Sequence, residues 1–517
     1  MAQQAQVARE RDDGHGHGVV IGSGFAGLTA ARALANFMDR VTVVERDWVP
    51  RGPGRRRGVP QARHTHTLTG VAQQGLEELF PHIGEDLVGA GATRVRIPED
   101  MLLLGPGGWL PRTGSDLSML SAGRDLIDAV IRDRLRADPK VTFLPEHEAV
   151  ALEPGRHDTV TGVWVRGRDR KAPEGWTARR LISADFVVDA TGRGSHAPEW
   201  LTRLGYAPPK ETAPEPSTTV ATAMYAPPVG HVADWKSLLL MPAPGHPVQG
   251  MLHPLEGGRW SVSVSTGDGS RAPGDHAGLL HSLADLRHSL LRDVLEVATP
   301  LGPVYVCGSA GNRWRHYEKL RRWPDQFLVV GDAFVALDPA HGQGMTVAVQ
   351  CATVLDHLLT AHGTTIGLGY RLRRAIAHRL APAWHTAILG VRAAHGCQDP
   401  EAGWFARLSG RYAARVAAAA STRPAAAELL LDRLGSVPMP ATALRPSVLG
   451  AALRGPRGPV PAAPPSTTHG PDARRRRPAA LGGSPPVGVS TGSDRWRPVA
   501  GPSAQGPGKA LFDRHRP

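Results

Sequence analysis

The segment that follows the polar N-terminus constrains the fold of this chain more than any other. An apolar run over 19–21 leads into the pattern G-x-G-x-x-G, formed by Gly22, Gly24 and Gly27. Apolar residues at helical spacing follow, and a second apolar run ends at Glu45. This order predicts a strand, a tight turn, a helix and a second, parallel strand. The first glycine permits the turn, the second permits close approach of a pyrophosphate, and the third lets helix and strand pack closely.

The same segment predicts a dinucleotide site. Glu45 stands 18 positions after Gly27, at the end of the second expected strand, where a carboxylate accepts hydrogen bonds from a ribose diol. The amino terminus of the helix offers free N–H groups and partial positive charge to phosphates. The competing interpretation is an ordinary glycine-rich turn beside a surface glutamate. The motif by itself does not distinguish FAD from NAD.

A later segment favours FAD. Asp332 follows an apolar run, at a position where its side chain can bond a ribityl hydroxyl. Pro339 ends the intervening loop, and Gly342 and Gly344 let backbone N–H groups approach a flat ring. A helix that begins at about Met345 would direct its positive end at that ring. Such a helix stabilises the negative charge of a reduced flavin.

These motifs resemble the two FAD fingerprints of the class A flavoprotein monooxygenases. The segment 185–195 resembles the third signature of that family, and Arg124 resembles the family arginine that reaches the cofactor from a helix start. The resemblance covers residues 18–360. The FAD-binding residues that it and the motifs imply are Gly22, Gly24, Phe25, Ala26, Gly27, Glu45, Arg46, Arg63, Arg124, Asp189, Gly192, Gly331, Asp332, Pro339, Gly342, Gly344 and Met345.

The loop over 55–68 is most similar to that of the FAD-dependent epoxidases that act on polyether polyketide precursors. Squalene epoxidases and aromatic hydroxylases resemble the chain more distantly. The resemblance implies that reduced FAD and O2 form a C4a-hydroperoxide, which epoxidises an alkene of a hydrophobic, polyketide-like or polyene-like intermediate. Electrons would come from NAD(P)H or from a reductase partner. Candidates for a part in the chemistry are Arg63, His64, His66 and Pro339, although for the two histidines a structural role in holding the loop is the favoured interpretation.

Two departures argue against a phenol hydroxylase. Phe334 stands where aromatic hydroxylases often have histidine, and Thr346 where they often have asparagine. An aromatic hydroxylase of the same family nevertheless remains an alternative, as does an alkene reductase similar to the geranylgeranyl reductases. A non-catalytic flavoprotein scaffold is a weaker alternative, because the glycines of both motifs and Asp332 are intact. An NAD dehydrogenase is weaker still, because the later glycine motif would then have no role.

The chain-wide pattern predicts an α/β fold, with a Rossmann-like FAD-binding domain and an inserted β-sheet substrate domain, as in para-hydroxybenzoate hydroxylase. Within the insert we expect a hairpin around Gly257 and a helix over 277–297. The expected divisions are a flexible N-terminus over 1–17, the FAD-binding domain over 18–204 and 326–365, the substrate domain over 205–325, a helical region over 366–450 and a basic, disordered tail over 451–517.

The substrate pocket should form where the sheet of the inserted domain faces the flavin. Large side chains on its expected strands are the candidates for the wall, although core packing is the competing interpretation for each one. These candidates are Met224, Tyr225, Leu239, Met251 and Trp260.

Composition excludes several other classes. The net charge is +13, but residues 451–517 hold eleven Lys/Arg and three acids, so the body is only mildly basic and nucleic acid is not expected as a partner. The cysteines Cys307, Cys351 and Cys397 lack metal-ligand spacing, and no metal is expected at the His15/His17 or His64/His66 pairs. No run is long enough to span a membrane and the N-terminus lacks a signal peptide, which predicts a cytoplasmic protein.

Overall fold

The computed structural model describes residues 16–465 except 113–115, 173, 215–217, 244, 267–271, 309–310, 395–403, 435–439 and 459–460. Almost all of the expected flexible N-terminus, and the expected tail from residue 466 onward, lie outside the described residues. His15, Cys397 and the arginine run of the tail lie there too.

A parallel sheet forms the centre of the FAD-binding part. Its five strands stand in the order β21-β12-β1-β2-β8 and all run parallel. Every residue of β1 is buried, as expected for a strand covered on both faces. The bounds are β1 His17–Ile21, β2 Arg40–Val44, β8 Val141–Leu144, β12 Phe186–Asp189 and β21 Phe327–Val329.

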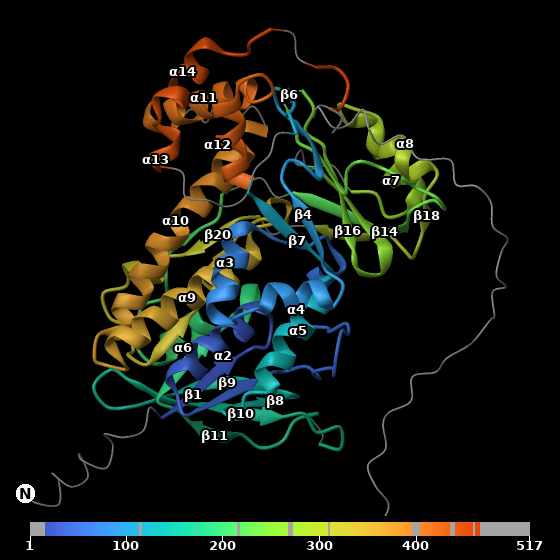
Figure 1. Ribbon diagram of the computed structural model, residues 1–517. Coiled ribbons are helices and arrows are strands. Elements are labelled where there is room, and N and C mark those ends of the chain that lie inside the picture. Colours follow the sequence, from blue (N-terminus) through green and yellow to red (C-terminus); the bar gives the residue numbers. More distant parts are fainter. Residues whose placement is uncertain are drawn as a thin grey trace, which may run out of the picture. The chain divides into compact units, whose positions relative to one another are not determined.

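Helices cover one face of this sheet and a smaller antiparallel sheet covers the other (Figure 1). The helices are α2 (Phe25–Phe37), α5 (Arg124–Arg136) and α9 (Gly344–His362). The antiparallel strands are β9 (His147–Pro154), β10 (Val160–Gly167) and β11 (Arg180–Ser183). Because β1, α2 and β2 follow one another around the tight turn, the βαβ unit expected from the first glycine motif is present.

A second, eight-stranded sheet holds the inserted region. Its order is β18-β14-β17-β16-β15-β5-β6, and β19 pairs with β14. The expected hairpin is formed by β16 and β17. The division expected at residue 204 differs from the structure, because the apolar strand β5 leaves the first segment and pairs in parallel with β15. The bounds are β5 Met101–Gly105, β6 Gly108–Trp109, β14 Thr219–Ala226, β15 Ser237–Leu240, β16 Gln249–Leu255, β17 Arg259–Thr266, β18 Thr299–Pro300 and β19 Tyr305–Gly308.

The two faces of this sheet differ in chemistry. On one face Tyr225, Val262 and their neighbours form an apolar core with α7 (His276–Ser282) and α8 (Leu290–Glu296). The single helix expected over 277–297 is therefore two helices, because the backbone is extended at Leu286. On the other face the alternate residues of β17, together with one residue of β14, carry hydroxyl groups. They are Thr222, Ser261, Ser263 and Ser265.

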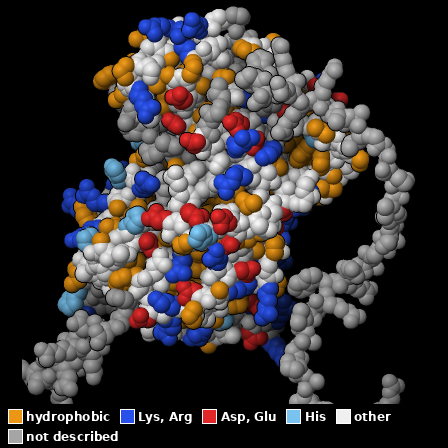
Figure 2. Space-filling view, in the orientation of Figure 1, with side chains coloured by type: hydrophobic (Ala, Val, Ile, Leu, Met, Phe, Trp, Pro, Cys, Tyr) orange, Lys and Arg blue, Asp and Glu red, His pale blue; other side chains and the backbone are white. Residues whose placement is uncertain are grey.

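Helices close the described chain. α10 packs on α9, and the later helices form an apolar cluster with Leu103 and Leu239 of the second sheet. Trp404 and Leu453 are exposed on these helices, and Figure 2 shows hydrophobic side chains over this part of the surface. No described helix combines the length and the apolar character needed to cross a membrane. The bounds are α10 Leu368–Ala394, α11 Trp404–Ala419, α12 Pro424–Leu434, α13 Pro440–Ala443 and α14 Pro446–Arg454.

The remaining helices and strands are short. The small helices are α3 (Gly70–Leu79), α4 (Ile83–Gly89) and α6 (Ala197–Arg203). One small sheet contains β3 (Thr67–Leu68), β7 (Ser118–Ser121) and β4 (Thr93–Arg96), and another contains β13 (Glu211–Thr212), β20 (Arg313–Arg315) and β22 (Val335–Ala336).

Candidate cofactor and substrate site

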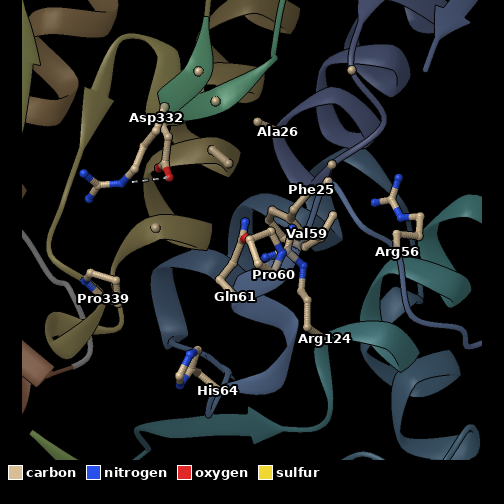
Figure 3. Close-up of a pocket in the computed structure, with 18 of the residues that line it drawn as sticks. Phe25, Ala26, Arg56, Val59, Pro60, Gln61, His64, Arg124, Asp332 and Pro339 are labelled. Atoms are coloured by element: carbon tan, nitrogen blue, oxygen red, sulfur yellow. Dashed lines mark ion pairs between the residues drawn. The ribbon is translucent and has the colours of Figure 1, made fainter. Parts of the chain in front are cut away.

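A cavity of about 1000 Å³ lies where the carboxyl ends of the parallel strands meet the second sheet. This is the edge at which open α/β sheets bind ligands. Figure 3 shows Phe25, Arg124, Asp332 and Pro339 around this space. Most of the residues expected from the motifs line it, namely Gly22, Gly24, Phe25, Ala26, Glu45, Arg46, Arg63, His64, His66, Arg124, Gly192, Asp332, Pro339, Gly342, Gly344 and Met345. Three expected residues do not line it: Gly27, Asp189 and Gly331.

The glycines of the first turn have separable roles. Gly22 adopts a φ of +97°, a conformation that favours glycine. A Cβ on Gly27 would stand 1.9 Å from the Gly22 carbonyl oxygen, so this glycine is required for packing inside the protein. A Cβ on Gly24 would meet nothing within 4 Å, although Gly24 lines the cavity. Gly24 thus leaves a cradle at the start of α2 that suits a pyrophosphate.

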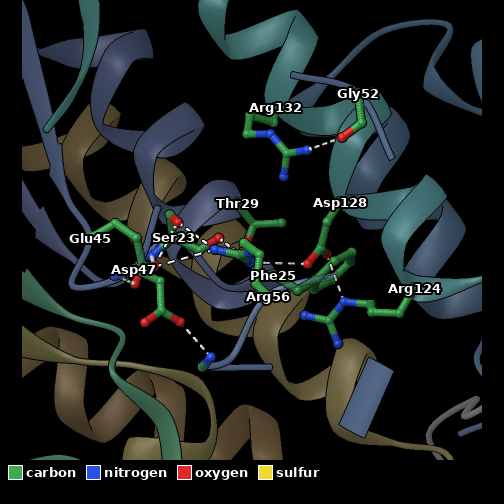
Figure 4. Close-up of polar contacts among 11 residues, drawn as sticks. Ser23, Phe25, Thr29, Glu45, Asp47, Gly52, Arg56, Arg124, Asp128 and Arg132 are labelled. Carbon is green, nitrogen blue, oxygen red and sulfur yellow. Dashed lines mark hydrogen bonds and ion pairs between the residues drawn. The ribbon is translucent and has the colours of Figure 1, made fainter. Parts of the chain in front are cut away.

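Glu45 is held by its own chain at the edge of the cavity (Figure 4). Its Oε2 accepts hydrogen bonds from the backbone N–H (2.8 Å) and the hydroxyl (2.7 Å) of Ser23. Its Oε1 accepts one from the Asp47 N–H at 2.9 Å. Because a carboxylate oxygen has two lone pairs, Oε1 retains one site for a ribose hydroxyl.

Arg56 joins this carboxylate to α5, and the motifs did not single it out. Its side chain is 4% exposed, and it lies 3.3 Å from both Glu45 Oε2 and Asp128 Oδ2. The other oxygen of Asp128 accepts a 2.6 Å hydrogen bond from Arg124 Nε. The Arg124 guanidinium in turn stands over the ring of Phe25, 5.2 Å from its centroid. The sequence feature that could have identified Arg56 is the run of three arginines in the loop. The sequence does not indicate which of the three is buried.

Arg193 is the second functional candidate that the motifs did not single out. Its Nε lies 4.0 Å from Asp332 Oδ2, while its terminal nitrogens donate to the carbonyl oxygens of Gly311 and Leu337. Burial raises the pKa of Asp332, and Arg193 is the strongest of the cations that oppose this effect. The sequence feature that could have identified Arg193 is the presence of a basic residue inside the turn of the third motif.

Asp189 builds that turn without reaching the cavity. It is fully buried, and its carboxylate accepts hydrogen bonds from the Ser195 hydroxyl (2.5 Å) and from the Thr191 N–H (2.9 Å). Burial raises the pKa of Asp189, and these hydrogen bonds oppose the shift. The residue therefore positions Gly192 and Arg193, both of which line the cavity.

The loop after Asp332 is fixed from several directions. Asp338 Oδ1 accepts a 2.9 Å hydrogen bond from the Ala340 N–H, and Asn312 Oδ1 accepts one from the Asp338 N–H. Gly342 takes a left-handed φ of +64°. Helix α9 then begins at Gly344, which lines the cavity, so the positive end of this helix faces the space.

The two residues that depart from the aromatic hydroxylase pattern do not line the cavity. Phe334 is fully buried and packs on Tyr317, with ring centroids 5.4 Å apart. Thr346 is 1% exposed and its hydroxyl lies 3.1 Å from that of Thr69. Both side chains therefore contribute to the core.

The two histidines of the loop connect it to the second sheet. His64 Nδ1 lies 2.8 Å from Thr222 Oγ1, and His66 Nδ1 lies 2.9 Å from the carbonyl oxygen of His64. Burial, assisted by Arg63, lowers the pKa of His64. Burial, assisted by Arg124, lowers the pKa of His66 to about 3. His66 is thus neutral at pH 7, and because Nδ1 donates to a carbonyl, its Nε2 is an acceptor. Among the described residues no three potential ligands are placed to hold a metal.

The substrate wall differs from the expected one. Of the five candidates only Met251 lines the cavity. Tyr225 and Trp260 point to the opposite face, since side chains alternate along a strand, and Leu239 packs on the C-terminal helices. Met224 does not line the cavity either. The wall instead contains Val220, Ser263, Ser265, Tyr305 and Cys307.

Arg63 lies against this wall. Its guanidinium carbon stands 4.5 Å from the centroid of the Tyr305 ring, and both residues line the cavity. Arg63 is exposed, so this contact is made at the mouth.

The chain belongs to the family described as FAD binding domain, whose model matches residues 17–387. The matched segment contains all the cofactor residues discussed above. FAD is therefore the cofactor, and the open cradle at Gly24, the N-terminus of α9 and the arginines of the cavity suit its pyrophosphate and ring.

A curated relative and several solved structures are similar to this chain. Protein Rv3254 of Mycobacterium tuberculosis is 32% identical over 432 residues, which cover 81% of this chain and 89% of the relative. The flavin-dependent brominase Bmp2 superposes with a TM-score of 0.58 at 14% identity, covering 84% of this chain and 97% of Bmp2. PqsL of Pseudomonas aeruginosa, described as a probable FAD-dependent monooxygenase, gives 0.53 at 18% identity, with 73% and 95% covered. At these identities the structural likeness concerns the fold, and the chain is an FAD-dependent enzyme with the fold of flavin monooxygenases and halogenases.

Proposed function

We propose that this protein is an FAD-dependent monooxygenase that epoxidises an alkene of a hydrophobic natural-product intermediate of the polyketide or polyene type. The observation that supports it best is a shared cavity. Asp332 and Gly344, from the loop assigned to the flavin ring, line the same space as Val220 and Met251 of the second sheet. An apolar molecule against this wall therefore shares one space with the cofactor residues.

The cofactor supplies the redox step, since reduced FAD activates molecular oxygen. The chain supplies binding and orientation. Gly24 and the start of α2 hold the pyrophosphate, and the Arg56 network fixes Glu45 beside the ribose. The N-terminus of α9 stabilises negative charge at the ring, and Arg193 fixes Asp332 near it. Val220 and Met251 hold the alkene and exclude water from it.

No protein nucleophile is required by this proposal. His66 is neutral at pH 7 and lines the cavity, where its Nε2 can accept a hydrogen bond. His64 is engaged by Thr222 at Nδ1 and holds the loop against the sheet.

A second candidate is an aromatic hydroxylase. The hydroxyl group of Ser265 on the wall favours a more polar substrate than a hydrocarbon, and a phenol could hydrogen-bond it. An alkene reductase is the third candidate, and a halogenase is suggested by the likeness to Bmp2.

Product analysis under oxygen-18 gas separates these functions. The protein is incubated with FAD, a flavin reductase, NADH, chloride, bromide and a panel of polyenes and phenols. The masses of the products are then determined by mass spectrometry. We expect one labelled oxygen on an alkene. Label on a ring identifies an aromatic hydroxylase, two added hydrogens without label a reductase, and an added halogen a halogenase. Absence of label from every product, while reduced flavin is consumed by oxygen, contradicts the monooxygenase proposal.

The source of electrons is tested separately. Without oxygen, the absorbance of the bound flavin is followed after addition of NADH or NADPH alone. Rapid bleaching indicates direct reduction by the nicotinamide, whereas bleaching only after a reductase is added indicates a partner.

A further inference from the structure

A chain of hydroxyl groups crosses the cavity-facing side of the second sheet. Thr222 Oγ1 lies 2.7 Å from Ser263 Oγ, which lies 2.8 Å from Thr65 Oγ1. Thr65 Oγ1 also lies 2.7 Å from Ser261 Oγ, and His64 Nδ1 closes the other end of the chain at Thr222. Because each hydroxyl carries a single proton, the hydrogen-bond donors within the chain are largely used inside the protein.

Ser265 lies on the same face of β17 as Ser261 and Ser263 but does not belong to this series of hydrogen-bonded hydroxyls. It is 4% exposed and lines the cavity, and its hydroxyl has no hydrogen-bond partner among the described residues. Because the hydroxyl opens onto the cavity, it remains available to hydrogen-bond a molecule bound there. A ligand oxygen that reaches this hydroxyl would replace water as its partner.

Ser265 lies near the loop that is expected to hold the flavin ring. Ser265 pairs across the sheet with Gln249, whose Nε2 reaches the carbonyl oxygen of Ala340 at 3.5 Å. Ala340 and its neighbour Pro339 line the cavity together with Ser265. The free hydroxyl is therefore at the end of the sheet nearest the expected ring.

The part of the cavity wall that the second sheet forms beside Ser265 is uncharged. Val220, Met251 and Ser263 line it from the same sheet face. Arg63 lies at the mouth, with its guanidinium over the ring of Tyr305. A single available hydroxyl among uncharged side chains suits a neutral oxygen acceptor better than a carboxylate, whose desolvation it does not offset.

We propose that Ser265 is a specificity-determining residue that donates a hydrogen bond to a carbonyl or hydroxyl oxygen of the substrate. The substrate class is then a largely apolar, uncharged alkene or aromatic compound that carries at least one such oxygen, rather than a plain hydrocarbon. This inference rests on the proposed function for its site, but its test measures binding and does not require turnover.

The test compares two probes of equal length. One is geranylacetone, which has isolated alkenes and a ketone, and the other is the hydrocarbon in which a methylene replaces the carbonyl. Dissociation constants are measured from the change in flavin absorbance of the FAD-loaded protein, for the wild type, Ser265→Ala and Ser265→Thr. We expect the wild type to prefer the ketone. Ser265→Ala should weaken ketone binding about five- to tenfold and leave hydrocarbon binding unchanged. Ser265→Thr, which keeps the hydroxyl, should restore the preference.

Several outcomes would overturn the inference. A wild type without preference for the ketone, including one that binds neither probe, excludes it. Equal weakening of both probes in Ser265→Ala indicates a packing role, and a lowered affinity for FAD alone indicates that the hydroxyl bonds the cofactor. FAD content and thermal stability of each variant, measured in parallel, show whether the fold is retained. Failure of the oxygen-18 experiment would remove the monooxygenase assignment without altering these binding constants.

Discussion

Arg193 Nε lies 4.0 Å from Asp332 Oδ2, although 139 residues separate them in the sequence. The contact joins the turn after β12 to the loop after β21, which are neighbouring strands of the parallel sheet. It therefore fixes the side chain expected to meet the cofactor ribityl chain. The contact between Arg193 and Asp332 can form only when the two motifs are folded against each other.

Substitution of Asp332 tests the flavin-loop assignment. We expect Asp332→Ala to fold but to bind FAD about ten- to a hundredfold more weakly, because a charge-assisted hydrogen bond is lost. The measurement is fluorescence titration of the apoprotein with FAD. Asp285→Ala, at an exposed position between α7 and α8, is the matched control and should change nothing. Full cofactor affinity and turnover in Asp332→Ala would remove the assignment.

Substitution of Arg56 tests the buried network. Arg56→Ala leaves two carboxylates, Glu45 and Asp128, without their shared cation, and should lower the free energy of unfolding by about 3 kcal/mol. Arg51→Ala, in the same loop but exposed, should change it by less than about 0.5 kcal/mol. Urea denaturation of the FAD-loaded proteins measures both. Equal effects of the two substitutions would contradict the role of the network.

The two glycines of the turn should respond in opposite ways to one added methyl group. Gly27→Ala brings Cβ against the Gly22 carbonyl oxygen and should prevent stable folding, seen as loss of soluble protein. Gly24→Ala has open space for its Cβ and a φ of −69° that alanine adopts readily, so thermal stability of the apoprotein should be retained. Its FAD affinity should fall at least about tenfold, because the methyl group occupies the cradle of the pyrophosphate. Unchanged FAD affinity would place the phosphates elsewhere.

His253 should make the protein less stable in acid. It is 6% exposed, its Nδ1 lies 2.8 Å from the Ser237 hydroxyl, and burial lowers its pKa from 6.5 to about 4. Since the unfolded chain takes up the proton first, acidification from pH 6.5 towards 4 favours unfolding. The contribution at pH 4 is about 3 kcal/mol.

The prediction is checked by comparing variants across this range. In His253→Gln the loss of unfolding free energy between pH 7 and pH 4 should be smaller than in the wild type by about that amount. His281→Gln, at an exposed position in α7, is the control and should follow the wild type. Parallel pH profiles for all three proteins would exclude His253 as a contributor.

Local sequence features were sufficient to predict the cofactor side of the site. Gly22 and Gly342 satisfy backbone requirements and Gly24 leaves open space, and all three effects act over a few residues, so the spacing of the glycines carries the information. The parallel strands are continuous apolar runs that can be recognised without knowledge of their neighbours. For this reason the family, the cofactor and the order of the elements followed from the sequence.

The substrate side was decided by tertiary structure. Tyr225 and Thr222 belong to one strand, and only the docking of α7 and α8 on one face determines that the tyrosine enters the core while the threonine faces His64. In the same way only the position of Asp128 on α5 distinguishes Arg56 from the arginines beside it. Such choices depend on contacts between residues far apart in the sequence, whose partners a local pattern does not contain. The sequence by itself therefore determined which cofactor the protein binds, and the tertiary structure decided which side chains surround the substrate.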